Sequence, residues 1–184
     1  IDATAQGSNI KEVDEALKSA SKKGTGESGF PDFTAKVKDF LIVIEDKSDL
    51  SKHCKLDSNS CIDLDNIKSI TDYAVNGAIH YAKHLSKNTS FKKIIAIGVS
   101  GDEKHHKISP YFINERGILD KKLNDLETFT LLNEDNIESY YSQEILNITP
   151  KEETTDEEVK QDAEYLHECL RNYGAIKDAD KPLI

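Results

Sequence analysis

Two uninterrupted apolar stretches lie between the segments of this chain whose pattern predicts helices. Residues 40–44 read FLIVI and residues 94–99 read IIAIGV, which is typical of strands that are covered on both faces of a sheet. Directly before the first stretch, residues 33–37 alternate apolar and polar side chains, as a strand with one polar face does. We therefore predict a hairpin that turns near residues 37–39, and a separate central strand over residues 92–101.

Apolar residues recur every three or four positions in three further segments, which predicts amphipathic helices. The last of them is opened by a capping box of Thr155 and Glu158 and ended by Gly174. The three predicted helices cover residues 9–22, residues 66–85 and residues 159–173.

The remaining segments predict loops and shorter strands. Residues 48–65 are polar and aperiodic, as a surface loop is. Residues 106–114 predict a strand, which Pro110 would place at a sheet edge or bulge, and residues 126–133 predict another short strand. Helices that alternate with strands in this order predict an α/β fold, with a mixed central sheet flanked by helices and a C-terminal helical extension. We expect one domain over residues 1–150 and a helical linker over residues 151–184.

Composition and charge narrow the classes of function. The chain has 34 acidic and 24 basic residues and a net charge of −10, which argues against a dedicated nucleic-acid grip within it, because phosphate neutralisation needs Lys and Arg. Three cysteines are too few for a disulfide framework and favour a reducing cytoplasm. No apolar run is long enough to span a membrane, so we expect no membrane partner. A chain that starts at Ile1 and contains no Met is expected to be a piece of a longer protein.

The candidate catalytic residues lie at the end of the first apolar strand, where the sequence reads Glu45-Asp46-Lys47. An acidic residue followed two positions later by Lys occurs four times in the chain, so the tripeptide alone carries little weight. Only Glu45 also ends a buried strand and follows Asp32 at hairpin distance. Side chains two apart on a strand share a face, and the hairpin brings Asp32 beside Glu45.

Such a cluster suits hydrolysis of phosphodiesters. Two carboxylates and the backbone carbonyl of Asp46 suffice to hold Mg²⁺, which prefers oxygen ligands and keeps several waters. Lys47 would then orient or activate the attacking water and screen developing charge. A structural ion-pair cluster is the alternative, since charged groups often sit where a strand emerges into water.

Other candidate groups point to simpler roles. We expect His53 to be an exposed loop residue and Cys54 and Cys61 to be free loop thiols, because no second pair with zinc-ligand spacing follows. His80 is expected to be a packed or surface residue, and His105 with His106 a solvated pair. The segment 95–103 lacks the Gly-Lys-Ser/Thr of a phosphate loop, which excludes nucleotide binding.

Pro31-Asp32, twelve intervening residues and then Glu45-Asp46-Lys47 resemble the PD-(D/E)xK nuclease signature. Together with DYAVNGAIHYAKHL at 72–85 and KKIIAIGVSG at 92–101, they resemble the N-terminal nuclease domain of bacterial restriction–modification polypeptides. These are the type I motor-subunit and fused type IIG restriction-methyltransferase kinds. Type I members often carry Gln-x-x-x-Tyr in the helix after the catalytic lysine. Gly77 precedes Tyr81 at that spacing here, which favours the fused enzymes.

The resemblance implies a restriction-endonuclease-like core and Mg²⁺-dependent cleavage of double-stranded DNA, with Mn²⁺ as a substitute. Asp32 and Glu45 would bind the metal, and Glu12 or Glu15 would help from the first helix, Glu12 being preferred. The closing residues 166–184 resemble the entry to an adenine-specific methyltransferase. The partners would be DNA and the protein's own methyltransferase and target-recognition regions or subunits, with S-adenosylmethionine bound only in that missing region.

Two other functions stay open. The first is a catalytically inactive nuclease-fold scaffold that docks the methyltransferase. The second is a DNA-repair or structure-specific nuclease of the same fold, which would carry its own basic DNA groove.

Overall fold

A six-stranded mixed sheet forms the centre of the protein. The computed structural model describes residues 2–148. The spatial order of the strands follows the sequence, from β1 to β6. β3 and β4 are parallel, and all other neighbours are antiparallel. The strands are β1 (Ala3–Ala5), β2 (Phe33–Val37), β3 (Phe40–Lys47), β4 (Lys93–Gly101), β5 (His106–Ile113) and β6 (Leu119–Lys122).

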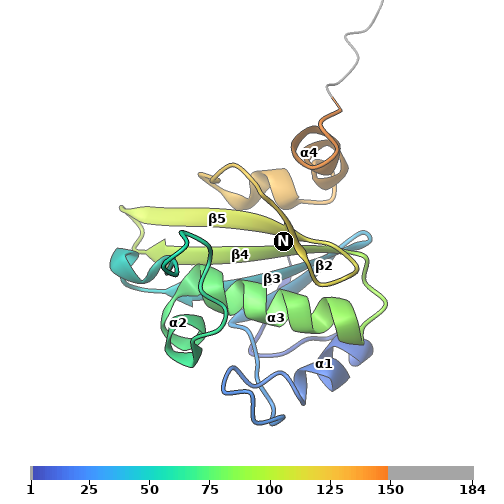
Figure 1. The fold of residues 1–184 in the computed structure, drawn as a ribbon. Coiled ribbons are helices and arrows are strands. Elements are labelled where there is room, and N and C mark those ends of the chain that lie inside the picture. Colours follow the sequence, from blue (N-terminus) through green and yellow to red (C-terminus); the bar gives the residue numbers. More distant parts are fainter. Residues whose placement is uncertain (1, 149–184) are drawn as a thin grey trace, which may run out of the picture. The chain divides into compact units, whose positions relative to one another are not determined.

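Helices cover both faces of this sheet. Helices α1, α2 and α3 lie on one side and α4 on the other (Figure 1). Leu17, Ile79 and Val43 belong to the core on the α1 and α3 side, and Ile42 and Ile137 to the core on the α4 side. The α/β class with a mixed, helix-flanked sheet is therefore confirmed. The helices are α1 (Lys11–Leu17), α2 (Ile67–Asp72), α3 (Ala74–Asn88) and α4 (Ile137–Glu144), with 3₁₀ turns η1 (Leu50–Lys52) and η2 (Phe129–Leu132). None of these described helices is both long and apolar enough to cross a bilayer.

The predicted hairpin of β2 and β3 is confirmed. Its turn contains Lys38, whose φ is 53°. Phe33 pairs with Ile44, so the residue before β2 and the residue after Ile44 meet at the same end of the hairpin. This register is what places Asp32 next to Glu45.

Two predicted helices differ from the structure. The first ends at Leu17 rather than at residue 22, because the chain folds back on itself and the amide of Gly29 donates to the carbonyl of Leu17 (3.0 Å). The second is broken at Tyr73, which is extended (φ −117°, ψ 136°) and separates α2 from α3. After the break, the amide of Val75 donates to the carbonyl of His53 (2.9 Å) instead of to a preceding helical turn.

The C-terminal part of the described chain also corrects the prediction. Residues 126–133 contain the 3₁₀ turn η2 and not the predicted strand. The elements β1, β6 and α4 were not predicted from the sequence pattern. Strand β5 is not at an edge, because β6 pairs with it from Tyr111 to Ile113, but the register of this pair does shift between Phe112 and Ile113, two residues after Pro110. The predicted capping box and the helix over residues 159–173 lie outside the described residues.

Candidate active site

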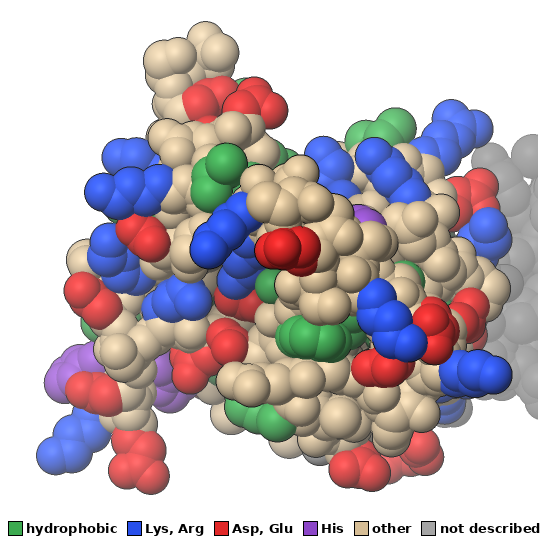
Figure 2. All heavy atoms as spheres, turned by 90° about the horizontal axis from the view of Figure 1, so that it is seen from below, with side chains coloured by type: hydrophobic (Ala, Val, Ile, Leu, Met, Phe, Trp, Pro, Cys, Tyr) green, Lys and Arg blue, Asp and Glu red, His purple; other side chains and the backbone are tan. Residues whose placement is uncertain are grey.

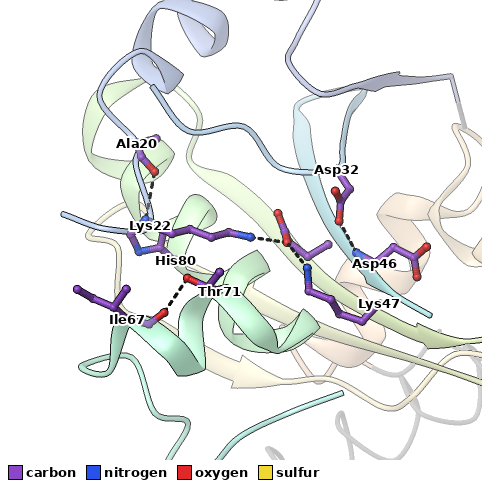
Figure 3. A network of polar contacts seen from close by, with 9 residues as sticks. Ala20, Lys22, Asp32, Asp46, Lys47, Ile67, Thr71 and His80 are labelled. Atoms are coloured by element: carbon purple, nitrogen blue, oxygen red, sulfur yellow. Dashed lines mark hydrogen bonds and ion pairs between the residues drawn. The ribbon is translucent and has the colours of Figure 1, made fainter. Parts of the chain in front are cut away.

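Glu45 is the central residue of the candidate site. Alternation along β3 puts Leu41, Val43 and Glu45 on the face that α1 and α3 cover, and Glu45 is only 1% exposed. Its Oε2 lies 2.6 Å from the Nζ of Lys22 and 3.6 Å from the Nζ of Lys47. Figure 3 shows the two ammonium groups reaching this carboxylate from different segments of the chain. Glu45 and Lys47 therefore share a face, as the strand period requires.

The second oxygen of this carboxylate has no partner. Oε1 of Glu45 is buried and forms no hydrogen bond within residues 2–148. Burial raises the pKa of the Glu45 carboxyl above its usual range, the ammonium of Lys22 opposes this shift, and the negative charge of Asp32 adds to it. An ionisable oxygen left unpaired in a desolvated place is energetically costly, so it marks a position where a cation would be stabilised.

Asp32 lies at the same end of the hairpin and is half-buried. One of its oxygens, Oδ2, accepts a hydrogen bond from the backbone amide of Asp46 (2.8 Å), as Figure 3 shows. With Ala5, Gln6 and Phe33, the two aspartates line an open cavity of about 410 Å³. The hairpin register thus brings Asp32, Glu45 and Lys47 to one rim of the sheet, where Asp32 lines this cavity and Glu45 and Lys47 do not.

Two glycines allow α3 to approach this part of the sheet. Gly98 lies opposite Glu45 in the register of β3 and β4, and a Cβ there would lie 2.5 Å from Cγ2 and 2.6 Å from the backbone nitrogen of Val75. A Cβ at Gly77 would lie 3.1 Å from both Oε2 of Glu45 and Nζ of Lys22. The ion pair therefore occupies the space that a side chain at position 77 would take.

Lys22 is the site residue that sequence reasoning missed. It follows α1 in a segment of turns, its side chain is 15% exposed, and its Nζ lies 5.0 Å from the centre of the Tyr81 ring. No periodicity or motif distinguishes it from the neighbouring Lys23. The contact arises because the chain folds back after Leu17, and only the tertiary structure shows that return.

The first-helix glutamates lie elsewhere. Glu12 accepts hydrogen bonds from the amide (3.0 Å) and the hydroxyl (2.8 Å) of Ser90, which precedes β4 and so lies at the strand end remote from Gly98. Glu15 pairs with Lys18 at 2.7 Å. The structure brings neither carboxylate to Glu45, and Lys22 is the residue that this region supplies.

The donor set fits a hard divalent cation. Within residues 2–148, no group of three or more His, Cys, Asp or Glu side chains is arranged to hold a metal ion. Asp32 and Glu45 offer two carboxylates, one of them with an unpaired buried oxygen. Mg²⁺ is commonly held by one or two carboxylates, its remaining ligands being waters and substrate phosphate oxygens, so this pair is sufficient for it.

The prediction that His53 is an exposed loop residue is wrong. It is 8% exposed, and its Nδ1 and Nε2 lie 2.7 Å from the hydroxyls of Ser100 and Ser109. Ser109 in turn donates to Asp125 at 2.5 Å, so His53 Nε2 carries the proton and donates to Ser109. Burial lowers the pKa of His53 to about 4. The neutral imidazole therefore connects the loop after β3 to β4 and β5.

The simpler expectations for the other groups are confirmed. Cys54 and Cys61 are free thiols, half-buried and exposed respectively. His105 and His106 are exposed. His80 is packed, with Nε2 3.2 Å from the carbonyl of Ala20.

The chain is similar in sequence to a known restriction enzyme and methyltransferase. No protein-family model matches the chain, and no solved structure matches it. The chain is 39% identical over 181 residues to the type II restriction enzyme and methyltransferase RM.BcgI of Heyndrickxia coagulans. The similarity covers 97% of this chain and 28% of that protein, so the chain spans less than a third of the relative's length.

Proposed function

We propose that this chain is the Mg²⁺-dependent endonuclease domain of a restriction–modification enzyme and that it hydrolyses phosphodiester bonds of double-stranded DNA. The observation that carries the proposal is the meeting of Asp32, Glu45 and Lys47 at one rim of the sheet, with an unpaired buried oxygen on Glu45. The PD-(D/E)xK pattern of the sequence and the similarity to a restriction enzyme support the same conclusion.

Each residue would have a separate task. Asp32, Glu45 and the carbonyl of Asp46 would hold the metal, which when bound lowers the pKa of a water ligand and stabilises charge on the phosphoryl oxygens. Lys47, whose Nζ lies 3.6 Å from the Glu45 carboxylate, would orient the attacking water and stabilise negative charge as it develops. The contact with Lys22 fixes Oε2 of Glu45, so that Oε1 is the oxygen left for the metal.

Sequence recognition and methylation would lie outside this chain. The printed name of the relative joins a restriction enzyme with a methyltransferase, and a fused methyltransferase would bind S-adenosylmethionine in its own region. Figure 2 shows basic and acidic side chains interspersed on the face formed by α1, α2 and α3. A mixed surface of this kind favours a domain that is delivered to DNA by neighbouring regions over a repair nuclease that grips DNA by itself.

Cleavage of supercoiled plasmid by the full-length protein tests the proposal. Glu45→Gln and Lys47→Ala should each reduce Mg²⁺-dependent cleavage by at least 100-fold, roughly the effect of removing one charge-stabilising group. Glu103→Gln, a change in the exposed β4–β5 turn, is the matched control and should cleave normally. Methylation by the same preparations should be unchanged, which shows that the rest of the protein is folded. Normal cleavage by Glu45→Gln would refute the assignment.

One observation favours the inactive scaffold instead. Lys22 and Lys47 both lie near the Glu45 carboxylate, so the cluster is balanced in charge without a metal. Titration of Mn²⁺ by calorimetry separates the two functions: the nuclease binds Mn²⁺ and Glu45→Ala abolishes the binding, whereas the scaffold shows no binding in either form.

A further inference from the structure

Helix α3 is basic in an acidic chain. Its 15 residues contain Lys83, Lys87, His80 and His84 and no Asp or Glu, although acidic residues outnumber basic ones by 34 to 24 in the whole sequence. A helix that lacks carboxylates in such a chain concentrates positive potential locally.

These four residues share one side of the helix. Positions 80, 83, 84 and 87 follow the spacing i, i+3, i+4 and i+7, which places them on one face. We call them the α3 basic face. Together with Leu64 they line a cavity of about 240 Å³, which has room for a phosphate group.

The two histidines are fixed, and the two lysines carry the available charge. Nε2 of His84 lies 2.9 Å from the carbonyl of Ala16, and Nε2 of His80 lies 3.2 Å from that of Ala20. Burial lowers the pKa of His80, which keeps that ring neutral. Lys83 and Lys87 form no ion pair with any side chain that the structure describes.

Asp63 and Asp65 flank Leu64 in the loop that closes the cavity, and neither forms an ion pair with Lys83 or Lys87 among the described side chains. Leu64 follows Asp63, whose Oδ2 accepts from the hydroxyl of Ser69 (2.6 Å) and whose Oδ1 accepts from the amide of Asn66 (3.2 Å). These hydrogen bonds lower the pKa of Asp63 and satisfy its carboxylate locally. Asp63 therefore forms no ion pair with Lys83 or Lys87.

The α3 basic face begins beside the candidate active site. His80 lies next to Lys22, and the ammonium of Lys22 contacts Glu45 (Figure 3). From position 80 to position 87 the helix rises about 10 Å, at 1.5 Å per residue. Lys83 and Lys87 are two cations about one helical turn apart on a face that leads to the candidate active site, which matches a polyanionic backbone better than a single small anion.

We infer that the α3 basic face binds phosphate groups of the DNA backbone next to the scissile bond. The identity of the ligand as DNA rests on the proposed function, whereas the cationic face itself does not. Contacts of this kind fix the register of the duplex without reading its sequence. Lys83 and Lys87 would supply two such contacts.

A purely structural role for these lysines predicts something different. Lys87 lies in the last turn of α3, where a cation stabilises the helix dipole. In that case its removal would lower stability slightly and leave DNA binding unchanged.

Binding of a short DNA duplex to the full-length protein in EDTA, followed by fluorescence anisotropy from 0.1 to 1 M salt, tests the inference. Each lost phosphate contact lowers the slope of log affinity against log salt by about 0.9, so Lys83→Gln/Lys87→Gln should lower it by about 1.8. If affinities are equal at 1 M salt, the variant binds about 30-fold more weakly at 0.15 M. The control Lys11→Gln/Lys104→Gln removes the same charge from exposed positions elsewhere and should retain the wild-type slope.

The outcomes separate this inference from the proposed function. A slope for the α3 variant equal to that of the control overturns the inference, even where Glu45→Gln abolishes cleavage. A reduced slope together with normal cleavage by Glu45→Gln keeps the binding face and removes the nuclease assignment. Wild-type unfolding midpoints for the variants, measured by circular dichroism, exclude a loss of fold as the cause.

Discussion

Gly98→Ala tests how closely α3 packs on the sheet beside Glu45. The substitution adds one methyl group at the centre of β4, at a position whose backbone conformation any residue adopts. The added Cβ would lie 2.5 Å from Cγ2, 2.6 Å from the nitrogen and 2.8 Å from the Cα of Val75. Two of these atoms belong to the backbone of the first turn of α3, so a change of rotamer cannot relieve the contact.

The cost follows from the displacement that is needed. Ordinary van der Waals contact begins near 3.4 Å, so α3 must move away by about 0.8 Å at this point, and tightly packed interiors resist such shifts. Overpacking of this kind typically costs about 1–3 kcal/mol. The hydrogen bond from Val75 to the carbonyl of His53 would be weakened as well, which adds about 1 kcal/mol. We expect the free energy of unfolding to fall by about 3 kcal/mol.

Urea unfolding followed by circular dichroism measures this loss, with the m value expected to stay unchanged. Gly26→Ala is the matched control, because its Cβ would meet nothing within 4 Å whereas its φ is +73°. Its cost therefore comes from backbone strain alone and should be about 1 kcal/mol. A Gly98→Ala protein as stable as Gly26→Ala would show that α3 does not pack on Gly98 in this way.

Two further substitutions test the surroundings of the site. Folding lowers the pKa of His53 from 6.5 to about 4. As pH falls, His53 is therefore protonated first in the unfolded chain, which stabilises the unfolded state. The free energy of unfolding should drop by about 3 kcal/mol between pH 6.5 and 4. His53→Gln should remove this part of the pH dependence in urea titrations, and an unchanged slope would contradict the buried neutral imidazole. Gly77→Ala adds a Cβ 3.0 Å from the carbonyl oxygen of Ile70 and 3.1 Å from both Glu45 Oε2 and Lys22 Nζ, against a gain in helix propensity of about 1 kcal/mol. It should leave stability within about 1 kcal/mol of the wild type while lowering plasmid cleavage at least tenfold, and full activity would show that the ion pair tolerates the methyl group.

Local rules were enough to predict the hairpin and the position of its charged residues. The apolar run of β3, the alternation in β2 and the turn between them depend on neighbours in sequence, so the meeting of Asp32, Glu45 and Lys47 followed from strand geometry alone. The same rules located β4 and the helical face of α3. The α/β class followed from the order of these elements.

The errors lie where distant contacts override local pattern. The periodicity of residues 66–85 continues through Tyr73, but the amide of Val75 bonds to His53, and the helix breaks there. His53 sits in a polar segment, and its burial depends on Ser100 and Ser109, which are more than 40 residues away. Lys22 reaches Glu45 only because the chain reverses after Leu17. No window of sequence contains both members of these pairs.

The two glycines beside Glu45 connect the stability of the fold with the site. Glycine in the interior of a helix or a strand costs roughly 0.5–1 kcal/mol relative to alanine where an added methyl group meets no other atoms, but a methyl group at Gly77 or Gly98 would meet close neighbours. Each glycine has a separate effect. Because Gly98 has no side chain, α3 can approach the sheet, and because Gly77 has none, there is space for Lys22 to contact the Glu45 carboxylate. Both glycines lie beside the buried Glu45, and burial makes the charged form of its carboxyl unfavourable. Gly98 therefore serves the packing of α3 on the sheet, whereas Gly77, which leaves room for the ion pair, and the buried charge of Glu45 are better explained by the site than by the packing of the core.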